Sequence, residues 1–194
     1  MTSSARNYRR VQERHYSAHH ALLRVAGAEL DRAMRKEPGW FDSTFVVLTF
    51  SALAAEALSN AIGNRVIPDW KDFESASPNA KVRLLAERLT IPYEANSEPW
   101  QTIRWLGKFR NLVAHAKPEF VLHVHLITEQ KANERSTDPP KSKLERDVTI
   151  ANARRAFEAV GELKDLYCKK IPAKDRFGLY NDGWTSSTVP HHAA

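Results

Sequence analysis

Apolar residues recur at steps of three and four along most of this 194-residue chain, and prolines repeatedly interrupt the pattern. Such spacing places the apolar side chains on one face of an α-helix, and proline ends a helix or opens its first turn. The segments that the spacing predicts to be helical are 8–37, 42–65, 78–89, 97–117 and 150–170. We therefore expect an all-α fold, an antiparallel up-and-down helical bundle.

One segment follows a different period. Residues 120–127 alternate in the manner of a half-buried strand, which predicts a small strand or hairpin insert before the last helix. Residues 131–147 are charged and contain two prolines, so we expect a mobile loop there. We interpret 1–172 as a single domain and 173–194 as a C-terminal tail, whose aromatic side chains could dock on the bundle.

Cysteine usage and hydropathy indicate where such a chain would work. The single cysteine, Cys168, excludes an internal disulfide and fits a reducing compartment. The first eight residues lack the apolar core of a signal peptide, and the longest apolar stretch, 45–55, is too short to span a bilayer. We expect a cytoplasmic protein without a membrane partner.

The net charge of +6 indicates a polyanionic partner, and basic residues are concentrated near the N-terminus. We take four arginines there as candidate nucleic-acid contacts: Arg6, Arg9, Arg10 and Arg14. The alternative is a solvated helix face that only keeps the protein soluble.

The fourth predicted helix carries Arg110, Asn111 and His115. Arginine offers a planar fork of donors to a phosphate, histidine exchanges protons near neutral pH, and asparagine both donates and accepts hydrogen bonds. On a helical wheel Arg110 and His115 fall outside the apolar arc and bracket a strip formed by Gly107, Asn111 and Ala114. A strip of small residues permits close approach of another helix, so we expect a homodimer that packs on this strip. The alternative for the pair is an interface salt bridge and a helix-end histidine.

A second polar row follows the second helix, where Glu56, Asn60 and Asn64 are spaced by four. The row could be a hydrated edge with buried caps, or a set of supporting side chains that orients Arg110 or His115.

The segment Lys108-Phe109-Arg110-Asn111-Leu112-Val113-Ala114-His115 resembles the signature of the HEPN superfamily, the "higher eukaryotes and prokaryotes nucleotide-binding" domains. The upstream segment Ala54-Ala55-Glu56-Ala57-Leu58-Ser59-Asn60 is similar to the acidic-and-asparagine helix of that family. The resemblance is good over 42–118 and loose over the last helix. One branch of the family has a modified tyrosine two residues after the histidine, a position that Lys117 occupies here, so we do not expect that regulation.

The resemblance implies an all-α bundle that pairs so that two copies of the motif meet. Many members are metal-independent endoribonucleases of toxin–antitoxin, phage-defence or RNA-processing systems, which implies RNA and an antitoxin or regulatory protein as partners. His115 would then act as general base or acid, Arg110 would hold the scissile phosphate, and Asn111 would position the phosphate or the imidazole. Glu56 and Asn60 would support them, with no metal or other cofactor. Other members are catalytically silent modules that bind a nucleotide or a partner protein, and the sequence leaves both functions open.

The remaining chemistry-bearing residues point to no second site. His15 and His19 would lie one helical turn apart, a spacing that can bind metal, but no cysteine or carboxylate cluster accompanies them. His123 and His125 fit an exposed strand face, and Cys168 fits a small core residue.

Overall fold

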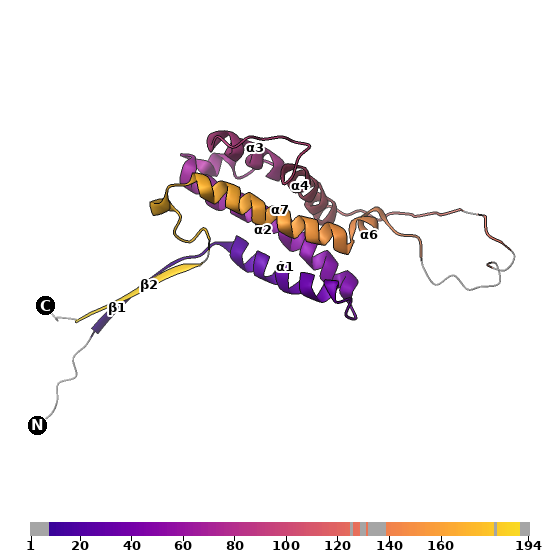
Figure 1. Ribbon diagram of the computed structural model, residues 1–194, viewed down its shortest axis with the longest axis horizontal. Coiled ribbons are helices and arrows are strands. Elements are labelled where there is room, and N and C mark those ends of the chain that lie inside the picture. Colours follow the sequence, from indigo (N-terminus) through magenta and orange to yellow (C-terminus); the bar gives the residue numbers. More distant parts are fainter. Residues whose placement is uncertain (1–7, 125, 129–130, 132–138, 181, 191–194) are drawn as a thin grey trace, which may run out of the picture.

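The computed structural model describes residues 8–124, 126–128, 131, 139–180 and 182–190. Its elements are strand β1 (Tyr8–His15), helices α1 (Ala18–Met34), α2 (Trp40–Val66), α3 (Pro78–Arg88), α4 (Trp100–Ala114), α6 (Lys143–Asp147) and α7 (Ile150–Lys170), the short 3₁₀ helices η1 (Trp70–Phe73) and η2 (Ala173–Asp175), and strand β2 (Gly183–Pro190). The helices form a bundle, and the two strands form a separate ribbon at one end (Figure 1). The mostly helical bundle with a small antiparallel strand pair is thus confirmed.

Helix α2 is the centre of the bundle. It packs against α1, α3, α4 and α7 as well as η1 (Figure 1). By length and composition α2 could cross a membrane. The apolar stretch 45–55 within it, the only part considered in the sequence analysis, is too short to do so. Half of the most apolar part of α2 is buried inside the bundle. A buried core helix can be as long and as apolar as a membrane-spanning helix, so these two properties alone do not distinguish the two.

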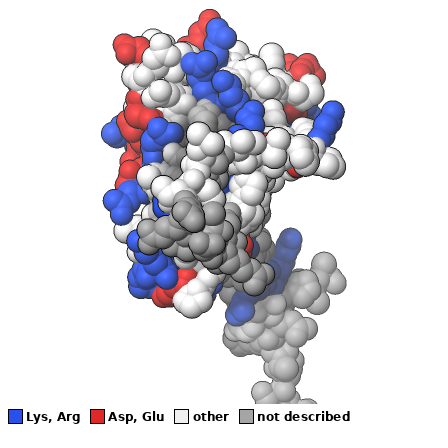
Figure 2. Space-filling model, turned by 90° about the vertical axis from the view of Figure 1, so that its right-hand side faces the viewer, with Lys and Arg blue, Asp and Glu red and all other residues white. Residues whose placement is uncertain are grey.

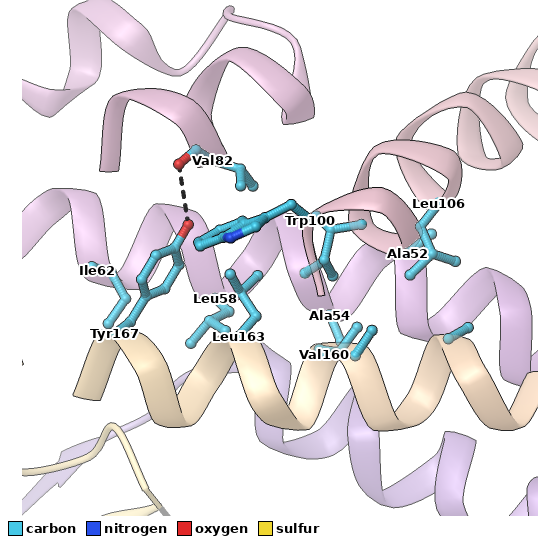
Figure 3. Close-up of a cluster of buried hydrophobic side chains, with 14 of the residues drawn as sticks. Ala52, Ala54, Leu58, Ile62, Val82, Trp100, Leu106, Val160, Leu163 and Tyr167 are labelled. Carbon is cyan, nitrogen blue, oxygen red and sulfur yellow. Dashed lines mark hydrogen bonds between the residues drawn. The ribbon is translucent and has the colours of Figure 1, made fainter. Parts of the chain in front are cut away.

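The core between α2, α3 and α7 is mostly apolar, and a hydrogen bond crosses it from α7 to α3. Leu58 and Ile62 pack beside Leu163 and Tyr167, and the Tyr167 hydroxyl donates to the Val82 carbonyl at 3.4 Å (Figure 3). Burial raises the pKa of that hydroxyl, so it remains a neutral donor. A hydrogen bond inside the core therefore fixes α7 against α3.

Helix boundaries follow local signals in most cases. Ser77 caps α3 by accepting from the Ala80 amide at 3.2 Å, with proline in the first turn as predicted. Helix α7 spans the predicted residues. Helix α2 begins two residues before the start of the predicted segment 42–65, because Gly39 adopts a left-handed conformation (φ +84°) that turns the chain into the helix earlier.

The prediction of one long helix from residue 8 is wrong for its first third. Tyr8–His15 is strand β1, which pairs antiparallel with β2 so that Tyr8 lies opposite Pro190 and His15 opposite Gly183. All of β1 is exposed, so its apolar residues line no helix face. The partner strand lies at the other end of the chain, and no local period can reveal such a pairing.

The predicted strand at 120–127 is absent from the described residues of that segment, where Phe120, Leu122, Val124 and Leu126 are exposed. The strand pair therefore joins the two ends of the chain instead of preceding the last helix. The predicted loop 131–147 contains helix α6, which a capping box between Ser142 and Glu145 starts. Residues 132–138 of that loop lie outside the described residues.

The C-terminal tail lies on α1 and α2. The His19 ring is buried: Nε2 donates to the Leu179 carbonyl at 3.1 Å, and Nδ1 accepts from the Ser17 hydroxyl at 2.6 Å. Because a carbonyl can only accept, Nε2 carries the proton in the neutral ring. Burial, together with the neighbouring His20, lowers the pKa of His19 to about 4. A neutral histidine thus holds the tail in place.

Candidate active site

Arg110 lies near the C-terminal end of α4 and faces α2. Its Nε is 3.6 Å from Oε2 of Glu56, and its side chain is 34% exposed. Ile103 and Leu106, seven and four residues earlier, are buried on the same side of the helix. Arg110 thus lies at the edge of the buried face of α4, partly exposed, beside the arc of apolar residues that packs against α2 and α3.

Glu56 contacts a second cation that the sequence analysis missed. The Lys81 ammonium of α3 lies 3.5 Å from Oε1 of Glu56, and the Lys81 side chain is only 1% exposed. One carboxylate thus faces two cations and leaves the cluster with a net positive charge. Lys81 shares a helix face with the buried Leu85, four residues on. A lysine on an otherwise apolar helix face is the sequence feature from which its burial could have been predicted.

Asn111 is exposed and binds its neighbour. Its Oδ1 accepts from Nη1 of Arg110 at 3.1 Å. The guanidinium is therefore held on its Nε side by Glu56 and on its Nη1 side by Asn111. Within the described part of the chain Nη2 has no acceptor, so one edge of the fork remains available for an anion.

Asn60 lies one turn beyond Glu56 on α2. Its Oδ1 is buried without a hydrogen-bond partner among the described residues, so it does not bind Arg110 or His115 there. The sequence placed Asn60 in the supporting row, and the structure brings only Glu56 of that row to the arginine.

His115 caps the C-terminal end of α4. Its amide donates to the Asn111 carbonyl at 3.0 Å, and the residue is exposed. Five residues separate it from Arg110, which corresponds to about 140° around a helix. In the part of the chain that is described, no group hydrogen-bonds to the His115 ring. A single subunit thus gathers Lys81, Glu56, Arg110 and Asn111, without the histidine ring.

Gly107 does not lie on an open strip. It is buried, and a Cβ at this position would lie 2.7 Å from Oδ1 of Asn79 in α3. The predicted subunit contact at Gly107 is therefore wrong: the close approach that this glycine permits is to a helix of the same chain. Asn111 and Ala114, the other members of the predicted strip, are exposed.

The candidate nucleic-acid arginines lie far from this cluster. Arg9, Arg10 and Arg14 are exposed on β1, and Arg6 lies outside the described residues. The ribbon projects from one end of the bundle, whereas α4 ends at the other, where the long connection to α6 leaves (Figure 1). On that far end Lys and Arg lie along the top and one edge with Asp and Glu among them (Figure 2).

The other histidines and the cysteine that could bind a metal or act as a nucleophile form no second site among the described residues. His15 is on the strand and His19 on α1, so the expected single-helix spacing of this pair is wrong. Among the described residues no three His, Cys, Asp or Glu side chains gather as a metal site would require. Cys168 is buried, and burial raises the pKa of its thiol. His123 is exposed, and His125 lies outside the described residues.

Comparisons of the chain with protein-family models, with curated proteins and with solved structures found no match.

Proposed function

We propose that the protein is a metal-independent endoribonuclease of the HEPN type that acts as a homodimer. The observation that carries the proposal is the arrangement of Arg110, whose guanidinium is held by Glu56 and Asn111 with one edge left for a phosphate. The ion pair between α2 and α4 supports the proposal, because it places the Glu56 carboxylate beside the motif arginine.

The proposed reaction needs only the substrate's own nucleophile. The ribose 2′-oxygen attacks the adjacent phosphorus while the bond from phosphorus to the 5′-oxygen breaks. The products are a 2′,3′-cyclic phosphate and a 5′-hydroxyl. His115 accepts the proton from the 2′-hydroxyl or donates one to the leaving 5′-oxygen, and Arg110 offsets the negative charge that grows on the phosphate.

In the proposed homodimer, the second subunit brings a His115 ring to the Arg110 cluster, which one subunit alone does not do. The exposed residues Asn111 and Ala114 lie at the end of α4 beside His115. A second copy packed there would place the His115 ring of one subunit near Arg110 of the other. Because the dimer would have two-fold symmetry, it would contain two such sites. The toxin–antitoxin or phage-defence setting, with an antitoxin protein as regulator, follows from the family resemblance alone.

A catalytically silent HEPN module that binds a nucleotide or a partner protein is the second candidate. It is favoured by the His115 ring, which has no orienting hydrogen bond in the described part of the chain, whereas a general base is usually oriented by a third group.

The test incubates purified protein with end-labelled RNA in EDTA and identifies the product termini by mass spectrometry. We expect cyclic phosphate ends with wild type, and a rate lower by about 10²–10⁴-fold with His115→Ala. The exposed His123→Ala is the matched control and should cleave normally. Equal cleavage by His115→Ala would reject the proposal, and no cleavage by wild type with or without magnesium would favour the silent module.

Oligomeric state is tested separately by light scattering at micromolar concentration. We expect a wild-type dimer, and Ala114→Arg should shift it towards monomer without changing the circular dichroism spectrum, since Ala114 is exposed. A wild-type monomer would reject the dimer.

A further inference from the structure

The terminal ribbon has two chemically different faces. Successive residues of a strand point to opposite sides, and the register sets which residues of β1 and β2 share a side. We call one side the arginine–aromatic face: Tyr8, Arg10, Gln12, Arg14, Trp184, Ser186, Thr188 and Pro190. The opposite side, the docking face, consists of Arg9, Val11, Glu13, His15, Gly183, Thr185, Ser187 and Val189.

The docking face rests on the tail at its base. The Phe177 ring packs edge-on against the His15 ring, with the ring centres 4.9 Å apart. A Cβ on Gly183 would lie 2.5 Å from the same Phe177 ring, so only glycine admits it there. Phe177 therefore covers this side of the ribbon where it joins the bundle, and the arginine–aromatic face points away from that contact.

The arginine–aromatic face exposes large aromatic side chains whose exposure does not stabilise the fold. Trp184 is 66% exposed and Tyr8 is 59% exposed, at opposite ends of the ribbon. Arg10 lies on this face between them and Arg14 lies opposite Trp184, whereas the only carboxylate within the strands, Glu13, lies on the docking face. An isolated two-stranded ribbon gains nothing from leaving large aromatic rings in water.

The two arginines are presented differently. Arg14 donates to Asp182 at 2.8 Å and lies over the Tyr16 ring at 4.9 Å, so it is held in a fixed position beside Trp184. Arg10 lies four residues nearer the tip, about 13 Å along the strand, and is exposed. From the tip to the base, this face thus presents Tyr8, then Arg10, and finally Arg14 side by side with Trp184.

We propose that the arginine–aromatic face binds single-stranded RNA. Arg10 and Arg14 contact phosphates, and Trp184 and Tyr8 stack on unpaired bases, the combination by which proteins bind single strands without reading sequence. A paired A-form helix stacks its bases internally and offers the rings no partner. The inference rests on the proposed function only in taking RNA as the ligand. The ribbon lies at the opposite end of the bundle from the C-terminal end of α4, so RNA bound to it would be held away from the proposed site (Figure 1).

The test measures fluorescence anisotropy of a labelled 12-nucleotide single-stranded RNA at several salt concentrations. All proteins carry His115→Ala, so that cleavage does not consume the probe. The face variant is Arg10→Gln with Trp184→Thr. The matched control is Lys170→Gln with Val189→Thr, which removes the same charge from the exposed end of α7 and an exposed apolar residue from the docking face. Melting temperatures check that all proteins are folded.

We expect the face variant to bind at least tenfold more weakly, since one stacked base and one phosphate contact are lost. Its plot of log affinity against log salt should be shallower by about 0.7, the value for one contact to a single strand. The control should bind within twofold of the parent, and duplex RNA should compete poorly. Equal weakening of both variants, no weakening of either, or equal competition by duplex would overturn the proposal. Each outcome is independent of whether wild type cleaves RNA.

Discussion

Glu56 and Lys81 form an ion pair in which the lysine is almost completely buried, with Nζ 3.5 Å from the carboxylate. Glu56→Gln removes the charge that compensates this buried ammonium, and we expect a loss of roughly 2–3 kcal/mol in unfolding free energy, reduced by the partial exposure of Glu56. Lys81→Met replaces the cation by an apolar chain of similar length and should cost much less. Urea titration of both variants measures the difference. If the two are equally stable, the pair does not hold the bundle together.

Arg110 should require its planar fork. We expect Arg110→Ala to reduce RNA cleavage as strongly as loss of His115, and Arg110→Lys to restore little, because an ammonium cannot bind Asn111 and a phosphate in the same geometry. Asn111→Ala should be milder, since Glu56 still positions the guanidinium. Single-turnover rates separate the three, and Arg83→Ala on the exposed side of α3 controls for lost surface charge. Full activity in Arg110→Lys would show that only charge matters.

His19 should make folding sensitive to acid. Its pKa is about 4 in the folded protein and near 6.5 when unfolded, so the unfolded chain binds more protons between these values. Stability should therefore decrease as pH falls from 6.5 towards 4, by up to about 3 kcal/mol. Thermal melts at pH 7 and pH 4.5 measure this loss. His19→Gln retains a donor for the Leu179 carbonyl and should flatten the dependence; an unchanged pH profile would assign the acid sensitivity to other groups.

Two helical glycines should respond oppositely to alanine. A Cβ at Gly63 would lie 2.3 Å from the buried Trp70 ring, so Gly63→Ala should destabilise by about 1–3 kcal/mol through overpacking. Gly161 in α7 has no neighbouring atom within 4 Å of its Cβ position, and Gly161→Ala should stabilise by up to about 1 kcal/mol from helix propensity. Melting temperatures of the two variants should move in opposite directions, and a shared direction would contradict this packing.

What the sequence determines is local. The caps at Ser77 and Thr149 and the apolar periods of α2, α3, α4 and α7 act within a few residues, so these helices were predictable from their own segments. The adjacent pair of Arg110 and Asn111 on a helix was equally visible, because neighbours in sequence remain neighbours in the fold.

Tertiary structure decided everything that depends on a distant partner. Strand β1 forms because β2, at the other end of the chain, supplies its hydrogen bonds, whereas its residues taken alone have a helical spacing. Arg110 faces Glu56, Lys81 is buried, and Gly107 meets Asn79 because α2, α3 and α4 pack together. A helical period in the sequence shows that one face of a helix is buried. The packing of the helices against one another decides which helices cover that face and how wide the buried face is.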